Sequence, residues 1–176
     1  MADCKGRSVL MIVPPARFKD DEYSRPRGML DRQGAHVKVA CAVNKLVFGL
    51  GQTRVKPDMT LEEVDVTQYD AFYIVGGIGV KDLYDHPHAL RIVQEAAAHN
   101  KIICAIDMGP TLLGKAGILQ GKKATEYFSE SKALAAMGVD YTGANVQQDG
   151  NIYTGKSAES SEKLAFALIC ALQAMA

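Results

Sequence analysis

Asp107 is the clearest candidate in this sequence for a residue that takes part in a reaction. It follows the apolar run 101–106 and precedes Gly109 and Pro110, where a short helix over 110–117 is predicted to begin. A strand that turns sharply into a helix presents one side chain at the helix N-terminus, and some hydrolases hold a nucleophile there. The dipole and the unpaired N–H groups of the helix favour an anion in this place. Asp107 can therefore act chemically or simply cap the helix, and the local pattern alone favours the cap.

Two glycine-rich segments match nucleotide-binding loops only in part. Gly76–Gly79 follows an apolar run but lacks the full spacing and the acidic residue of a dinucleotide-binding fingerprint. Thr154–Ser157 lacks the upstream glycine of a phosphate-binding loop. We interpret the first as a tight loop in the wall of the site, and the second as a hairpin end that leads into a helix.

Cysteines and histidines give no sign of a metal centre. Cys4, Cys41, Cys104 and Cys170 are widely separated and form no CxxC pair, which argues against both a zinc site and a disulfide framework. None of the four histidines falls at a strand end near the predicted site. We therefore predict neither a metal nor a cofactor.

Apolar runs alternate with amphipathic helical stretches along the chain. Strands are predicted over 8–13, 35–41, 70–75, 101–106 and 122–127, and helices over 21–34, 88–100, 110–117, 129–137 and from 157 onward. A hairpin excursion is predicted at 44–56, and a second hairpin over 145–153 around Asp149-Gly150. This alternation predicts an α/β fold, a three-layer αβα sandwich of the flavodoxin-like kind with a mostly parallel sheet and small hairpin excursions. In such sheets the site lies beyond the carboxyl ends of the strands.

Composition excludes several classes of function. The 176 residues are 48% hydrophobic and 23% charged, which is typical of a soluble globular protein. Lys+Arg and Asp+Glu both number 20, and this balance argues against a nucleic-acid binder. The longest apolar stretch, 164–176, is shorter than the ~20 residues of a membrane span, and no signal-peptide pattern precedes the first strand. We expect one domain over residues 1–176 in the cytoplasm, without nucleic-acid or membrane partners.

Many short motifs, in one order and spacing, resemble the ThiJ/PfpI superfamily, the DJ-type group within the class I glutamine amidotransferase-like fold. They extend over 8–172 and comprise Val9–Pro15, Phe18–Glu22, Pro26, Val55–Asp58, Tyr69–Ala71, Gly76–Gly77, Ala105–Pro110, Leu113, Ala116–Leu119, Gly121–Thr125 and Asp149–Asn151. No single motif is specific to this superfamily, but the order and spacing of all of them together are. The resemblance implies a flavodoxin-like sandwich with a reactive cysteine on the elbow between strand and helix, often followed by histidine.

This sequence departs from the superfamily at the elbow itself. Asp107 stands where the resemblance places the cysteine, and Met108 where it often places the histidine. Cys104 lies three residues earlier, inside the predicted strand, and cannot take the geometry of the elbow. Cysteine-dependent protease, deglycase or glyoxalase activity is therefore not expected.

Other residues that the resemblance assigns to the site are kept. Glu22, four residues before Pro26, matches a glutamate that reaches the elbow cysteine. Gly77 matches a backbone N–H donor, and Tyr127 matches a ring-bearing residue of the pocket. Lys19 stands where an acidic residue is common.

Glu22 and Asp107 would then bring two carboxyl groups together in a semi-buried site. Like charges in contact are unfavourable, so one group should take up a proton and donate a hydrogen bond to the other. Such a pair has the shape of an oxidised cysteine sulfinate held by a protonated glutamate. Our hypothesis is that Asp107 permanently imitates that oxidised state, and a helix cap in a degenerate site is the equally weighted alternative.

These observations favour a binding or regulatory homologue, a pseudoenzyme with a pocket formed by Glu22, Gly77, Asp107, Met108 and Tyr127. A carboxylate-based hydrolase or lyase for a small polar substrate, with Asp107 and Glu22 as its acid–base pair, is one alternative. A stress-protective, chaperone-like oligomer is another. The resemblance also implies a homodimer or larger homo-oligomer, and the pocket could take a small-molecule ligand.

Overall fold

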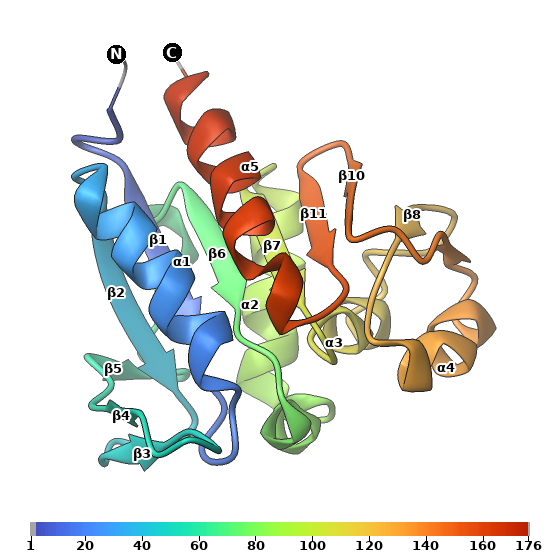
Figure 1. Ribbon diagram of the computed structural model, residues 1–176, viewed down its shortest axis with the longest axis horizontal. Coiled ribbons are helices and arrows are strands. Elements are labelled where there is room, and N and C mark those ends of the chain that lie inside the picture. The colour runs from blue at the N-terminus through green and yellow to red at the C-terminus, as the bar shows by residue number, and fades with distance from the viewer. Residues whose placement is uncertain (1–2, 176) are drawn as a thin grey trace.

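The computed structural model describes residues 3–175, and their main sheet confirms the predicted α/β class. The sheet has the strand order β10-β11-β7-β6-β1-β2-β5 (Figure 1). Its strands are β1 (Ser8–Ile12), β2 (His36–Cys41), β5 (Met59–Thr60), β6 (Ala71–Ile74), β7 (Ile102–Ile106), β10 (Val146–Asp149) and β11 (Ile152–Gly155). All neighbours pair in parallel except β10 and β11, which form the predicted antiparallel hairpin.

Helices cover both faces of this sheet (Figure 1). The α-helices are α1 (Asp20–Arg32), α2 (Pro87–Ala98), α3 (Pro110–Lys115), α4 (Ser131–Ala136) and α5 (Ser161–Gln173). Short 3₁₀ helices are η1 (Val66–Gln68), η2 (Ile78–Leu83), η3 (Phe128–Glu130) and η4 (Ala158–Ser160). Helices α1 and α5 lie against each other on one face, and α2 and α3 lie on the other.

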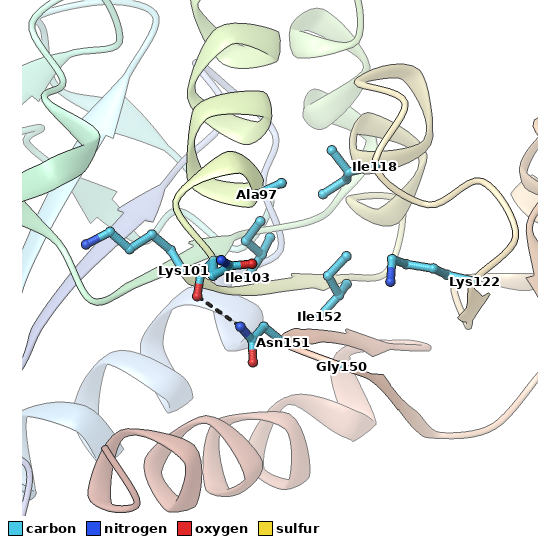
Figure 2. Close-up of a pocket in the computed structure, with 9 residues that line it drawn as sticks. Ala97, Lys101, Ile103, Ile118, Lys122, Gly150, Asn151 and Ile152 are labelled. Carbon is cyan, nitrogen blue, oxygen red and sulfur yellow. Dashed lines mark hydrogen bonds between the residues drawn. The ribbon is translucent and has the colours of Figure 1, made fainter. Parts of the chain in front are cut away.

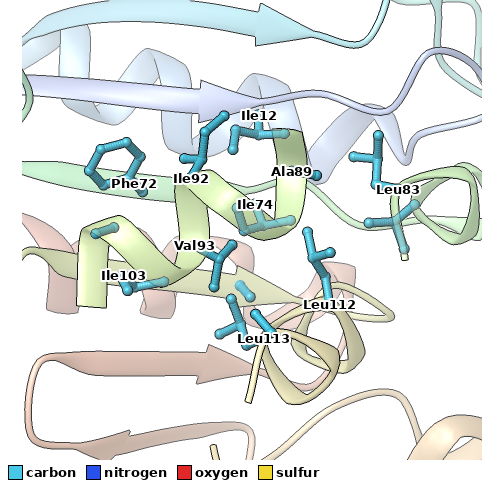
Figure 3. Close-up of a cluster of buried hydrophobic side chains, with 14 of the residues drawn as sticks. Ile12, Phe72, Ile74, Leu83, Ala89, Ile92, Val93, Ile103, Leu112 and Leu113 are labelled. Atoms are coloured by element: carbon cyan, nitrogen blue, oxygen red, sulfur yellow. The ribbon is translucent and has the colours of Figure 1, made fainter. Parts of the chain in front are cut away.

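Two hydrophobic clusters fill the spaces between the sheet and the helices. In β1, Leu10 and Ile12 face the α2 side, whereas Val9 and Met11 face the α1 and α5 side. Figure 3 shows the α2 side, where side chains of α2 and α3 meet those of the central strands. Because successive strand residues point to opposite faces and both faces are buried, these strands read as continuous apolar runs.

Of two predicted elements at the periphery of the fold, one is confirmed and the other is shorter than predicted. The excursion at 44–56 is confirmed as the antiparallel pair β3 (Val47–Phe48) and β4 (Arg54–Val55). The strand predicted over 122–127 shortens to β8 (Lys123–Ala124), which pairs with β9 (Asp140–Tyr141) outside the main sheet. Thr125 leaves the ladder because its N–H donates to the hydroxyl of Thr154 at 2.9 Å.

The last helix, predicted from residue 157 onward, begins later in the chain. Residues 158–160 form the 3₁₀ turn η4, and α5 begins at Ser161 with Ser160 at its N-cap position. No helix within residues 3–175 is both long and apolar enough to cross a membrane.

Candidate functional site

The elbow between β7 and α3 holds Asp107 in a left-handed backbone conformation with φ of 60°. Aspartate is one of the few non-glycine residues that adopts this conformation readily. The Asp107 N–H donates to the carbonyl of Gly155 at 3.0 Å, and its carbonyl accepts from the N–H of Tyr127 at 2.8 Å. The turn is thus fixed on both sides at the carboxyl end of the sheet, as the sequence predicted.

The Asp107 carboxylate is buried and fully partnered. Its Oδ2 accepts from the N–H of Gly77 at 2.9 Å, and its Oδ1 accepts from the ammonium of Lys19 at 3.1 Å. Only 1% of the Asp107 side chain is exposed. Gly77 reaches it with φ of 100°, a conformation that favours glycine. The residues therefore build a closed anion site.

Asp107 is not the helix cap that the local pattern favoured. The N-cap position of α3 is occupied by Gly109, and no side chain caps that helix. The hydrogen bonds to Gly77 and Lys19 occupy the Asp107 carboxylate instead. The side chain is thus held by groups from the loop after β6 and from the start of α1.

Lys19 places its charge inside the elbow from the N-cap position of α1. Besides the ion pair with Asp107, its Nζ lies 5.1 Å from the ring centroid of Tyr127, within the range of a cation–π contact. Burial alone would lower the pKa of Lys19, but the charge of Asp107 and their hydrogen bond outweigh it and raise that pKa. The ammonium is therefore held in its charged form.

Glu22 lies fully buried beside this ion pair on the first turns of α1. Burial, and after it the charge of Asp107, raises the pKa of Glu22 to about 9, so the group is neutral near pH 7. Within the described residues, neither of its oxygens has a hydrogen-bond partner. The N–H of Gly76 is close enough to lower that pKa slightly, but it does not reach hydrogen-bond geometry.

The shared proton expected between Glu22 and Asp107 is not found. The Asp107 oxygens accept from Lys19 and Gly77, and neither Glu22 oxygen has a hydrogen-bond partner among the described residues, so the two carboxyl groups interact through charge without a hydrogen bond. The hydrogen bond to Asp107 that was expected from a protonated Glu22 thus comes from the ammonium of Lys19.

Replacing Asp107 by asparagine should lower the pKa of Glu22 below about 9, because it removes the like charge that opposes ionisation. A carbon-13 NMR titration of the glutamate carboxyl groups would measure this change. Glu126 serves as an internal reference, because burial dominates its pKa and the charge of Asp107 contributes less to it than the charge of Glu130. An unchanged pKa for Glu22 would contradict the electrostatic coupling described above.

Tyr127 and Met108 differ in how they relate to the site. The ring of Tyr127 is half-buried against Lys19, and its N–H holds the elbow carbonyl. Met108 is buried in the hydrophobic cluster on the α2 side, and its carbonyl accepts from the hydroxyl of Tyr84 at 2.7 Å. Met108 thus anchors the elbow through its backbone and packs its side chain into the core.

Glu126 is a third buried acid, and the sequence argument missed it. One of its oxygens accepts from the hydroxyl of Thr111 in α3 at 2.9 Å, whereas the other has no partner among the described residues. Burial raises the pKa of Glu126 to about 8, and the charge of Glu130 adds to this effect. The available signal was a charged residue directly before Tyr127 in a segment predicted as a strand.

A cavity of about 380 Å³ lies at the opposite end of the sheet (Figure 2). Its floor includes Ile103 and Ile152, near the starts of β7 and β11, and its rim includes Lys101 and Lys122. The side-chain amide of Asn151 donates to the carbonyl of Asn100 at 2.9 Å. None of the residues predicted for the site lines this cavity.

The cysteines lie away from the elbow. Cys104 is fully buried in β7, where burial raises the pKa of its thiol well above its usual range. Cys4 and Cys41 are also buried, and Cys170 is exposed on α5. Across residues 3–175, no group of three or more His, Cys, Asp or Glu side chains is arranged to hold a metal ion.

Comparison with known proteins agrees with this architecture. An uncharacterized protein of Methanocaldococcus jannaschii is 31% identical over 172 residues, which cover 96% of this chain and 84% of that protein. The deglycase PfpI of Pyrococcus furiosus is 28% identical, with 81% of this chain and 86% of the deglycase covered.

Solved structures show the same fold. A ThiJ/PfpI domain protein from Brachyspira murdochii superposes with a TM-score of 0.94 at 24% identity, over 98% of this chain and 99% of the other. A protein of Anabaena variabilis with DJ-1/ThiJ/PfpI-like and ferritin-like domains superposes with a TM-score of 0.91 at 27% identity, over 94% of this chain and 50% of the other. The family model described as DJ-1/PfpI matches residues 7–171. The chain therefore belongs to the DJ-1/PfpI family.

Proposed function

We propose that this chain is a DJ-1/PfpI family member without the catalytic cysteine, and that it works as a binding or regulatory protein. The support begins at the elbow, where the side chain that faces Gly77 is the carboxylate of Asp107. Cys104, three residues earlier in the chain, is enclosed in the sheet. The deglycase activity named for the relative from Pyrococcus furiosus therefore does not extend to this protein.

The main support for the proposal is that both oxygens of the Asp107 carboxylate already have hydrogen-bond partners. A carboxylate that attacks a substrate needs an accessible oxygen, and nucleophiles in enzymes are activated by a neighbouring base. Here one oxygen is bound by Lys19, the other by Gly77, and the side chain is 1% exposed. The arrangement pairs this carboxylate with an ammonium and a backbone N–H, as a sulfinate imitation of an oxidised cysteine would require.

A carboxylate-based hydrolase or lyase is the second candidate. Its support is the contrast between Glu22, which burial keeps protonated, and the ionic carboxylate of Asp107. Two carboxyl groups in opposite protonation states form an acid and a base. In that case Glu22→Gln should abolish turnover while the protein remains folded, whereas a binding protein retains its ligand affinity within a few-fold.

The proposal is tested by placing a thiol in the elbow. In a Cys170→Ser background, which removes the exposed cysteine, Asp107→Cys should react with iodoacetamide at pH 7 at least about tenfold faster than an ordinary surface thiol. The reason is that Lys19 and the N–H of Gly77 would stabilise its thiolate. Ser129→Cys in the same background supplies the exposed reference thiol.

The unmodified protein supplies the decisive control. It should show no deglycase or glyoxalase turnover that iodoacetamide inhibits. Such turnover in the Cys170→Ser protein would assign chemistry to one of the remaining cysteines and overturn the proposal.

A further inference from the structure

We propose that the elbow is a receptor for an organic primary amine, whose ammonium group takes the place that Lys19 occupies between Asp107 and Tyr127. This inference rests on the proposed binding function and names the class of ligand. The groups around the Lys19 ammonium are those that bind cations, and in the free protein the chain's own lysine fills this site.

The receptor consists of two acids and an aromatic face. The Lys19 ammonium lies 3.1 Å from the Asp107 carboxylate and 5.1 Å from the centre of the Tyr127 ring. Carboxylates and aromatic faces are the groups that bind ammonium ions in proteins. Glu22 adds a fully buried carboxyl group with both oxygens unpartnered among the described residues, next to the same ion pair. One carboxylate thus binds the ammonium directly, and a second acid lies near enough to raise the pKa of that ammonium through its charge.

Lys19 is well placed to be exchanged. Its side chain is 35% exposed, whereas the Asp107 side chain is 1% exposed, so the cation lies on the solvent side of the pair. Its backbone is extended at the N-cap of α1 and is held by two hydrogen bonds, one from the N–H of Glu22 to its carbonyl at 3.1 Å and one from its own N–H to the carbonyl of Gly76 at 3.2 Å, so the exchange needs only its side chain to move. When the lysine turns outward, its ammonium regains water and a second ammonium restores the pairing of Asp107. The exchange therefore conserves the buried charge balance.

The surroundings select an amine with a short apolar or aromatic body. Ile78 directly follows Gly77, and Phe128 directly follows Tyr127, so both adjoin residues that contact the ion pair. Both are exposed, Ile78 by 39% and Phe128 by 65%, and the Phe128 ring centre lies 4.9 Å from that of Tyr127. An apolar group attached to the bound ammonium would cover this surface and remove it from water.

The test removes the internal cation and supplies an external one. In Lys19→Ala, phenethylamine should bind at least about tenfold more tightly than to the unmodified protein, because it no longer competes with a tethered ammonium. It should also raise the melting temperature of the variant. The probe 2-phenylethanol has the same shape without the charge and should bind at least about tenfold more weakly than the amine. Isothermal titration calorimetry and thermal unfolding provide the two readouts.

Two control variants locate the effect. Lys81→Ala removes an ammonium that pairs with Glu130 at 3.2 Å outside the elbow, and it should leave phenethylamine affinity at the level of the unmodified protein. Adding Asp107→Asn to Lys19→Ala should abolish the gain in affinity. Lys19→Met keeps most of the apolar stem and provides a second background if the alanine variant unfolds.

Equal affinity of Lys19→Ala for the amine and the alcohol would overturn the inference. Unchanged amine affinity after Asp107→Asn would also overturn it. Neither result affects the proposed function, which fails if the unmodified protein shows cysteine-dependent turnover or a turnover that Glu22→Gln abolishes. The two failures can therefore be distinguished.

Discussion

Raising the pH from about 6 to about 8 should lower the free energy of unfolding of this protein by several kcal/mol. In the folded chain, burial raises the pKa of Glu22 to about 9 and that of Glu126 to about 8. In the unfolded chain both glutamates ionise near their ordinary pKa of about 4.3. Between these limits the folded state binds more protons than the unfolded state, so stability falls as the pH rises.

Each group contributes at most about 1.4 kcal/mol per pH unit in this window. Glu126 should stop contributing to the slope of the free energy of unfolding near pH 8, and Glu22 near pH 9, because each group then ionises in the folded state as well. Below the ordinary glutamate pKa both states are protonated and the dependence disappears. Urea unfolding measured at several pH values would give the slope directly.

Glu22→Gln and Glu126→Gln should each flatten this slope, and the double variant should remove most of it. Asp20→Asn is the matched control, because the pKa of Asp20 is lowered, so its contribution is lost at acid pH and not in this window. Its carboxylate accepts from the N–H groups of Gly51 and Thr53, which hold the β3–β4 excursion against α1. A flat profile between pH 6 and 8 in the unmodified protein would show that neither glutamate is held neutral.

The position of Asp107 could be predicted from the sequence because local patterns determine it. An apolar strand followed by Gly-Pro at a helix start defines an elbow, and the backbone has that geometry. The sheet was predictable for a similar reason, since runs buried on both faces leave a continuous apolar signal. The strand at 122–127 was overestimated because Thr125 is held by hydrogen bonds to distant residues, Thr154 and Ala144, which no local pattern records.

The partners within the site could not be predicted to the same degree. Lys19 was noted as a departure from an acidic position, but a long side chain can lie in many directions, and its choice of Asp107 is a tertiary contact. The absence of a hydrogen bond between Glu22 and Asp107 follows from this contact. Glu126 was missed because the sequence around it does not indicate that it is buried, and its hydrogen bond from Thr111 of α3 is a tertiary contact.

Gly76→Ala should destabilise the protein by about 3 kcal/mol or more, because it places a methyl group where three parts of the elbow converge. A Cβ on Gly76 would lie 2.4 Å from the carbonyl oxygen of Ile106, 2.5 Å from an oxygen of Glu22 and 2.8 Å from the Cβ of Asp107. Glu22 can move, but the carbonyl of Ile106 belongs to β7 and moves only with the sheet. Urea unfolding would measure the loss.

Gly28→Ala tests whether the effect belongs to the elbow or to any glycine. Gly28 lies within α1, the helix that carries Glu22, and an added Cβ would meet only the flexible end of Arg32 at 3.3 Å. Alanine in a helix interior is favoured over glycine by about 0.5–1 kcal/mol, so this variant should be more stable than the unmodified protein. Opposite signs for the two substitutions would show that close backbone approach at Gly76 holds Glu22 against Asp107. A Gly76→Ala protein of unchanged stability would instead mean that β6, β7 and α1 are further apart at the elbow, and the charge coupling between these two acids would lose its structural basis.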